Sequence, residues 1–286
     1  MQLVAAAGLI ATSARSLPRI ALFQPRSIVA AVAALASGEA PTLLAGGTDL
    51  VAQFNLGVQP SALIDLSQVA ELRAIDTTAQ GLRVGACVTH GQGAVHAAVV
   101  ERAPGFAAAW ARIANPRIRM RATLGGNLMA MRTRYEVSLL LTALNARLEF
   151  ATQAGALQLS PSELWAGQAP PRSVLTAVHL ETASLASFTY ERTLRPLMTL
   201  AVALRRTDDG LHLSCAIASE FLPPLAMTQA LPGLQPQALA RNAQAIARDV
   251  FAQLPTTFAD PVLSNAYARR AGAVLLERRL GRASHG

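Results

Sequence analysis

The chain has 286 residues, of which 52% are hydrophobic, and it carries a formal net charge of +8. That length allows two domains of ordinary size with a large core, but no apolar run approaches the roughly 18 residues that a membrane-spanning helix needs. The positive charge comes entirely from arginine. Because the arginines are scattered and no basic strip has interleaved aromatic residues, the composition argues against nucleic-acid binding.

The beginning of the chain is apolar over residues 4–10, with no positive residue before that segment. A secretory signal peptide needs a charged start and a cleavage site. We therefore interpret residues 1–18 as an extension, with a transit peptide or a wrongly chosen start codon as open alternatives.

The next elements lead to a glycine pair. Helical spacing is expected over residues 27–37 and a strand over 42–44, and residues 43–50 then read Leu-Leu-Ala-Gly-Gly-Thr-Asp-Leu. Such a pair lets the backbone turn with φ > 0 and leaves consecutive N–H groups facing a concave anion site. Further strands are predicted at residues 62–66 and 82–86.

The cysteine content limits the cofactors that the chain can hold alone. Cys87 and Cys215 are the only two cysteines, and each lies in an apolar run typical of a strand. We predict that both are reduced core residues of a cytoplasmic protein. Two cysteines cannot bind an iron–sulfur cluster unaided, so any such cluster must lie on another chain.

A second glycine pair follows about eighty residues after the first. Helical spacing runs from residue 94 to 113 and breaks at Pro116, and residues 121–128 then read Arg-Ala-Thr-Leu-Gly-Gly-Asn-Leu. One glycine pair alone more often marks a tight turn or a bulge. Two anion nests from distant parts of the chain would instead hold one large phosphorylated cofactor between them. The motifs G-x-G-x-x-G and G-x-x-x-x-G-K-[ST] are absent, which excludes Rossmann and P-loop interpretations.

The rest of the chain alternates between helical and strand patterns. Residues 137–144 are apolar on all sides and predict a buried helix. A hairpin is expected from 146–150 and 157–159, followed by a loop that begins near residue 162. We predict three antiparallel strands and then a helical region broken by Pro255 and Pro261; these segments are 188–192, 199–205, 211–218 and 237–282. The five histidines are dispersed without metal-ligand spacing, and no catalytic triad is present.

Together these segments resemble the FAD-binding medium subunit of the molybdenum hydroxylases, of the xanthine dehydrogenase and carbon monoxide dehydrogenase type. The resemblance covers residues 18–282 and includes both glycine motifs in this order and spacing. Shorter segments support it: Pro25-Arg26-Ser27, Ile64-Asp65-Leu66, Ile118-Arg119 and Tyr267-Ala268-Arg269-Arg270.

The fold that the resemblance implies is of the α+β class. It is a two-subdomain FAD-binding fold of the PCMH type, followed by a C-terminal three-stranded antiparallel sheet with a small helical bundle. We expect the FAD-binding domain over residues 19–182, with subdomains of about 19–75 and 76–182, and the C-terminal domain over 183–286.

The resemblance also implies which residues bind FAD. The first motif would wrap the diphosphate and ribityl end, and the second would form another cradle. Ile113 and Leu175 would make apolar contacts, and Glu136 replaces an aspartate that would accept hydrogen bonds from ribityl hydroxyls. For Asp49 and Glu136 structural alternatives stay open: capping or stapling of the turn and a solvated helix start, respectively. The cofactor-binding set is Leu43, Leu44, Ala45, Gly46, Gly47, Thr48, Asp49, Leu50, Ile113, Thr123, Gly125, Gly126, Asn127, Glu136, Leu175 and Glu191.

Two departures from the family pattern bear on this site. Residues 129–135 are bulkier and more basic than usual, so the site is reshaped or the arginines face phosphate or a partner. Glu191 stands where the family often has a lysine near the flavin, and a carboxylate there would disfavour reduction to the anionic hydroquinone.

By resemblance, the chain is the electron-transfer subunit of a heterotrimeric, cytoplasmic enzyme. An iron–sulfur small subunit would carry two [2Fe–2S] clusters, and a large molybdopterin subunit would oxidise the substrate. Electrons would pass from the clusters to FAD and then to an external acceptor, with no catalytic acid or base on this chain. Two alternatives stay open: a diverged scaffold with weak or no FAD binding, and a stand-alone FAD oxidoreductase.

Overall fold

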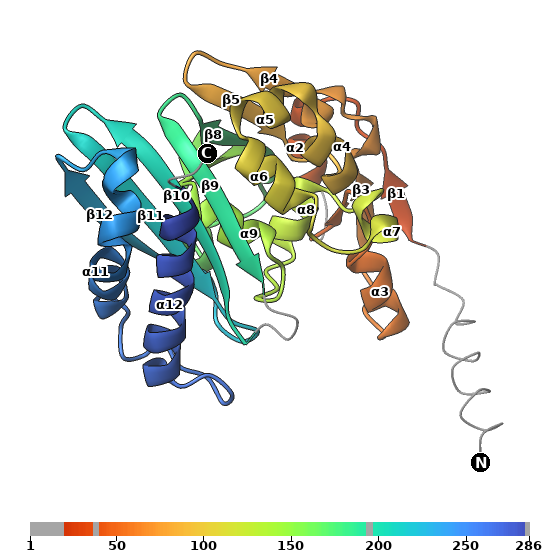
Figure 1. The fold of residues 1–286 in the computed structure, drawn as a ribbon. Coiled ribbons are helices and arrows are strands. Elements are labelled where there is room, and N and C mark those ends of the chain that lie inside the picture. The colour runs from red at the N-terminus through yellow and green to blue at the C-terminus, as the bar shows by residue number, and fades with distance from the viewer. Residues whose placement is uncertain (1–19, 37–39, 193–196, 284–286) are drawn as a thin grey trace.

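The computed structural model describes residues 20–36, 40–192 and 197–283 (Figure 1). The predicted extension at residues 1–18 lies outside this range. The described residues form three separate sheets. The first sheet lies at one end of the molecule and the C-terminal helices lie at the other, so the chain runs from end to end (Figure 1).

The first sheet is parallel, with the strand order β1-β3-β2. Parallel strands need crossover connections, and the helices α2 and α3 lie in the segments between the strands. Buried side chains of α2 pack with Ile64 in one of the three hydrophobic clusters. The elements are β1 (Ala21–Phe23), α2 (Ile28–Ala36), β2 (Thr42–Leu44), α3 (Leu50–Asn55), β3 (Ala62–Asp65) and two 3₁₀ turns, η1 (Leu66–Gln68) and η2 (Ala70–Arg73).

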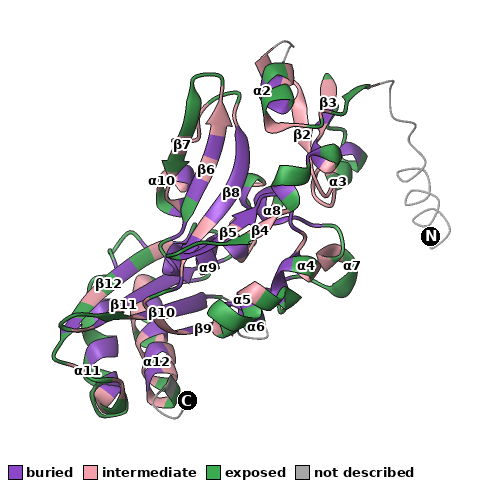
Figure 2. Cartoon of the chain, turned by 90° about the horizontal axis from the view of Figure 1, so that it is seen from above, coloured by how far each residue is buried: buried purple, intermediate pink, exposed green. Residues whose placement is uncertain are grey.

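The second sheet has five strands in the order β4-β5-β8-β6-β7, and all its pairings are antiparallel. Its bounds are β4 (Ile75–Thr77), β5 (Gly81–Gly85), β6 (Arg147–Thr152), β7 (Gly155–Leu159) and β8 (Val174–Glu181). β8 is buried along most of its length, whereas β7 is largely exposed at the sheet edge (Figure 2). The sequence did not predict β8, although it occupies the centre of the sheet.

Short helices cover one face of this second sheet. The helical stretch expected over residues 94–113 is not continuous. Residues 90–110 form three helices, because the chain extends at His96 and Pro104 can only restart a helix. The predicted loop near residue 162 begins with a short helix, α10, which has a complete capping box. The helices are α4 (His90–Val95), α5 (Ala97–Arg102), α6 (Pro104–Trp110), α7 (Pro116–Arg119), α8 (Leu124–Met129), α9 (Val137–Ala143) and α10 (Pro161–Trp165).

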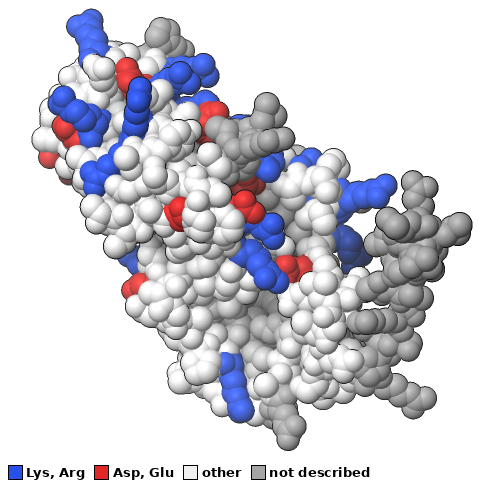
Figure 3. All heavy atoms as spheres, turned by 90° about the horizontal axis from the view of Figure 1, so that it is seen from below, with Lys and Arg blue, Asp and Glu red and all other residues white. Residues whose placement is uncertain are grey.

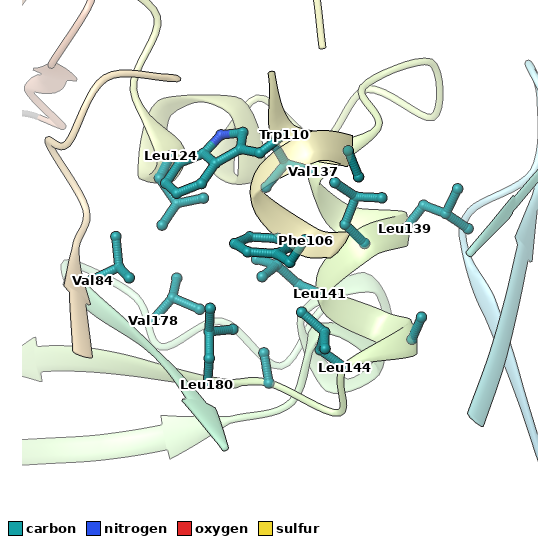
Figure 4. Close-up of a cluster of buried hydrophobic side chains, with 14 of the residues drawn as sticks. Val84, Phe106, Trp110, Leu124, Val137, Leu139, Leu141, Leu144, Val178 and Leu180 are labelled. Atoms are coloured by element: carbon teal, nitrogen blue, oxygen red, sulfur yellow. The ribbon is translucent and has the colours of Figure 1, made fainter. Parts of the chain in front are cut away.

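The largest hydrophobic cluster lies between these helices and the sheet. Phe106 and Trp110 of α6 pack beside Leu124 of α8 and over Val178 of β8, and all four side chains are buried (Figure 4). The predicted buried helix at 137–144 is confirmed as α9, in which every residue is buried.

The C-terminal sheet has four antiparallel strands, not the three that we expected. The fourth strand, β12 (Leu225–Pro232), is an edge strand rich in alanine and polar residues, so it carried little β-signal. One face of the sheet packs on α11 and α12, the predicted helical region. The bounds are β9 (Leu185–Arg192), β10 (Thr199–Thr207), β11 (Gly210–Ala218), a 3₁₀ turn η3 (Pro236–Ala238), α11 (Leu239–Ala252) and α12 (Asn265–Ala283).

A carboxylate ties three strands of the second sheet together. Glu149 of β6 accepts hydrogen bonds from Arg83 of β5 at 3.0 Å and from Thr176 of β8 at 2.7 Å, and it lies 2.7 Å from His179 Nε2. Burial raises the pKa of Glu149, but these hydrogen bonds outweigh burial and lower that pKa to about 2 from the ordinary value of 4.5.

This shift predicts an acid-dependent loss of stability. Because the folded pKa is depressed, the Glu149 carboxylate stabilises the fold above pH 4.5, and this contribution is lost as the pH falls towards 2. We expect Glu149→Gln to lower the free energy of unfolding at pH 7 by about 1–3 kcal/mol and to reduce the difference in Tm between pH 7 and pH 3. Thermal unfolding at both pH values measures this. Glu101→Gln, at an exposed position of α5, should behave like the wild type; equal pH dependence in both variants would contradict the assignment.

Candidate functional site

A cavity of about 550 Å³ is lined by residues of both the first and the second sheet. Its volume is within the size range of small-molecule and cofactor sites. Every predicted cofactor-binding residue except Glu191 lines it, so both glycine motifs, Ile113, Glu136 and Leu175 meet at one place. The other lining residues lie outside the predicted set; they are Thr42, Gln53, Leu66, Ala86, Cys87, Ala114, Ile118, Ala122, Met129, Ala130, Arg134, Tyr135, Val174 and Arg192.

The first glycine motif is an open turn pressed against the second. Gly47 has a φ of +73°, which favours glycine. A Cβ on Gly46 would lie 2.0 Å from the carbonyl oxygen of Arg121, so only glycine allows the two backbones to approach this closely. Among the described residues, the N–H groups of residues 46–49 donate to no acceptor. They are therefore free to donate to a ligand, as the predicted anion nest requires.

The second glycine motif is not an open nest, and that prediction was wrong. Thr123 caps α8, so the two glycines begin a helix. The N–H groups of residues 124–127 are all used: those of Leu124 and Gly125 donate to carbonyls of residues 88 and 86, and those of Gly126 and Asn127 donate to Thr123. This motif contributes its exposed Gly126 and Asn127 to the cavity lining instead.

Asp49 links the two halves of the site. Its carboxylate accepts hydrogen bonds from Tyr135 at 2.7 Å and from Gln53, and Arg132 lies 3.5 Å away. The Asp49 side chain does not cap α3. Its partners are Gln53 on α3 and, in the segment 129–135, Tyr135 and Arg132. Burial raises the pKa of Asp49, but these three partners lower it on balance. Burial and the bond to Asp49 raise the pKa of Tyr135 to about 12, so this phenol stays protonated.

The basic segment 129–135 forms part of the cavity wall. Met129, Arg134 and Tyr135 line the cavity, and Arg134 also pairs with Glu220 at 3.6 Å. Thr133 donates to the backbone carbonyl of Glu220. The segment is thus attached to the loop between β11 and β12 as well as to Asp49. On the face seen from below, arginines lie around a hollow and are distributed over the rest of the surface, and they do not form one continuous patch (Figure 3).

Glu136 is held by two residues of β9. Tyr190 donates to its Oε1, and Arg192 Nε lies 3.2 Å from the same oxygen. The Glu136 side chain is only 12% exposed, which contradicts the alternative of a solvated helix start. Burial and the nearby Glu136 raise the pKa of Tyr190, whose ring also lies 5.4 Å from the guanidinium of Arg112. Among the described residues, Glu136 Oε2 has no donor.

Glu191 does not reach the cavity. Successive side chains of a strand point to opposite faces, so Tyr190 and Arg192 face Glu136 while Glu191 pairs with Arg279 on α12. The charged residue of β9 that lines the cavity is therefore Arg192. The alternation of side chains along a strand would have identified Arg192 if the sequence had shown which face of β9 is turned towards the cavity.

The two cysteines are free and buried. Cys87 lines the cavity, and burial raises the pKa of its thiol to about 11. It is therefore protonated at neutral pH and unsuited to act as a nucleophile. No described helix is both long and apolar enough to cross a membrane.

Comparisons with known proteins agree on one family. The family described as "FAD binding domain in molybdopterin dehydrogenase" matches residues 18–180. The chain is 35% identical over 152 residues to the nicotine 6-hydroxylase medium subunit of Paenarthrobacter nicotinovorans, covering 53% of this chain and 54% of the relative. It is 35% identical over 113 residues to the carbon monoxide dehydrogenase medium chain of Hydrogenophaga pseudoflava, covering 39% of each. The matched part thus spans about half, or less, of the length of these relatives.

Solved structures resemble the fold over nearly the whole chain. Carbon monoxide dehydrogenase from Oligotropha carboxidovorans superposes with a TM-score of 0.79 at 23% identity, covering 94% of this chain and 99% of that one. Quinoline 2-oxidoreductase from Pseudomonas putida 86 gives a TM-score of 0.78 at 22% identity, covering 95% and 99%. At these identities the structural likeness establishes the fold.

Proposed function

The chain belongs to the family of FAD-binding domains of molybdopterin dehydrogenases, and we propose that its cavity binds FAD and that the subunit carries electrons through it. The donors would be [2Fe–2S] clusters on a small partner subunit, and a large molybdopterin subunit would oxidise the substrate. The complex would be a heterotrimer in the cytoplasm, and the final electron acceptor would be external.

The observation that carries this proposal is the convergence of both glycine motifs on one cavity. The free N–H groups of residues 46–49 suit the negative diphosphate. The Glu136 carboxylate suits the ribityl hydroxyls, and Ile113 and Leu175 offer apolar contact to the flavin ring. Arg134 and Arg192, which also line the cavity, add positive charge beside a dianionic group.

The protein's part in electron transfer would be to hold and tune the cofactor. When bound, FAD supplies reversible redox chemistry. The residues of the cavity position it and exclude water, and the Arg192–Glu136 pair sets the local charge. No side chain of the cavity has to move a proton: Tyr135 and Cys87 both have raised pKa values and stay protonated at neutral pH.

Cofactor content tests the proposal directly. We expect the full chain, purified and desalted, to show a flavin spectrum and to release FAD, not FMN, in near-stoichiometric amount. Gly126→Asp places a carboxylate on the exposed surface of the second motif and should abolish retention. Protein that is colourless and takes up no added FAD, alone and in its complex, would favour the scaffold alternative. Copurification of iron–sulfur and molybdopterin chains would argue against a stand-alone oxidoreductase.

A further inference from the structure

A fully buried histidine lies directly behind the second glycine motif. His90, at the start of α4, has no exposed surface. Its ring lies between two side chains: Trp110 Nε1 donates to Nδ1 at 2.9 Å, and the Asn127 amide lies 3.4 Å from Nε2. Asn127 lines the cavity, so these three residues connect the hydrophobic core to the candidate site.

The protonation of His90 follows from its partner Trp110. An indole N–H can only donate, so Nδ1 must accept and carry no proton. Burial and the nearby Arg119 lower the pKa of His90 to about 4, so the ring is neutral at neutral pH. A neutral ring with a bare Nδ1 has its single proton on Nε2.

This tautomer decides how the Asn127 amide is turned. With the amide nitrogen towards His90, two donors would face each other, and Oδ1 would be buried without a partner. With the amide turned over, Oδ1 accepts from Nε2–H of His90. The NH₂ group then takes the place for which the described residues offer no hydrogen-bond partner.

Resting on the function proposed above, we propose that His90 is a positioning residue that holds the Asn127 side chain, and with it the second glycine motif, in the place where that motif lines the cavity. The backbone supports this role, because His90 N donates to the carbonyl of Ala122 at 2.9 Å and Thr89 bridges to Thr123. The histidine and the glycine motif are therefore joined through the backbone as well as through Asn127.

Trp110 is itself fixed in place. A Cβ on Gly93 would lie 2.0 Å from its ring, so the glycine makes room for the indole. The ring packs beside Leu124, and its nitrogen lies on the side turned away from Val84, Val178 and Leu180 (Figure 4). The core thus holds the donor that selects the His90 tautomer.

A matched pair of variants of the full chain tests this assignment. A glutamine at position 90 places its amide nitrogen near the position of Nε2, whereas an asparagine reaches only the position of Nδ1. We expect His90→Gln to bind FAD within about threefold of the wild type and His90→Asn to bind about tenfold more weakly. Fluorescence titration of the deflavinated protein measures the affinity, and Tm should fall by similar amounts in both. Equal affinity losses in the two variants would overturn the proposal.

The same pair in an Asn127→Ala background gives the decisive comparison. If His90 acts through Asn127, the two His90 variants should bind FAD equally in that background. A tenfold difference that persists there would overturn the positioning role. Wild-type protein that fails to bind FAD at all would overturn the proposed function itself, and with it this inference.

Nuclear magnetic resonance of protein labelled with ¹⁵N-histidine reads the tautomer without any cofactor. We expect the His90 ring to show a protonated Nε2 and a bare Nδ1 between pH 6 and pH 8. A proton on Nδ1, or a doubly protonated ring in this range, would overturn the inference even if FAD binds tightly.

Discussion

Gly46→Ala should abolish FAD retention while leaving the protein folded. The added Cβ would lie 2.0 Å from the carbonyl oxygen of Arg121, a backbone atom that no side-chain rotation can remove. The two glycine motifs must therefore move apart, which widens the cavity that they line. We expect the dissociation constant for FAD to rise about 100-fold or more, with a loss of about 1–3 kcal/mol of stability. Fluorescence titration and thermal unfolding measure the two effects.

Gly57→Ala is the matched control for this variant. Gly57 follows α3 with a φ of +95°, and an added Cβ there meets no atom within 4 Å. This control therefore carries the strain of a positive φ without a collision. It should lose some stability and keep its FAD. Similar FAD affinities in the two variants would show that the contact between the loops does not form the site.

Glu136→Leu should weaken FAD binding by about 10- to 100-fold, the loss expected when hydrogen bonds to a charged group are removed. Leucine has a similar volume but removes the acceptor that we assign to the ribityl hydroxyls. It also leaves Tyr190 and Arg192 without their shared partner, because both contact Oε1. FAD titration at constant ionic strength measures the change.

Two further substitutions separate the roles of this carboxylate. Glu136→Asp keeps the charge, and by resemblance it restores the family residue, so we expect affinity within about fivefold of the wild type. Tyr190→Phe removes one donor to Oε1 without touching Oε2, and it should cost more stability than affinity. Unchanged FAD affinity in Glu136→Leu would rule out a direct role for the carboxylate.

Elements with a local signal could be predicted from the sequence. The two C-terminal helices and most strands show clear periodicity or turn residues, and their predicted ranges agree with the structure. β8 escaped prediction because a central strand is buried on both faces and therefore shows no alternation. β12 escaped because alanine and glutamine have low β-propensity.

The candidate site was predictable to the extent that it depends on short motifs. The two glycine motifs supplied twelve of the sixteen chosen residues and the family resemblance supplied Ile113, Glu136 and Leu175, and these fifteen line one cavity. They could not show that Thr123 would cap a helix and use the N–H groups of the second glycine pair. They could not reveal the bond between Asp49 and Tyr135, which are 86 positions apart. The face on which Glu191 lies depends on which side of β9 meets α6 and Glu136, and that is a tertiary property.

The central position of β8 has a consequence for the order of events during synthesis. β8 lies between β5 and β6, so those two strands do not belong to one sheet until residues 174–181 have paired with both of them. A nascent chain that has emerged only as far as β7 can form the β6–β7 hairpin, but it cannot close the sheet. Both glycine motifs and Glu136 leave the ribosome earlier than β8, which adds Val174 and Leu175 to the cavity wall, and Arg192 of β9 follows last. Translation must therefore pass residue 192 before the whole cavity wall exists, however early the glycine motifs emerge.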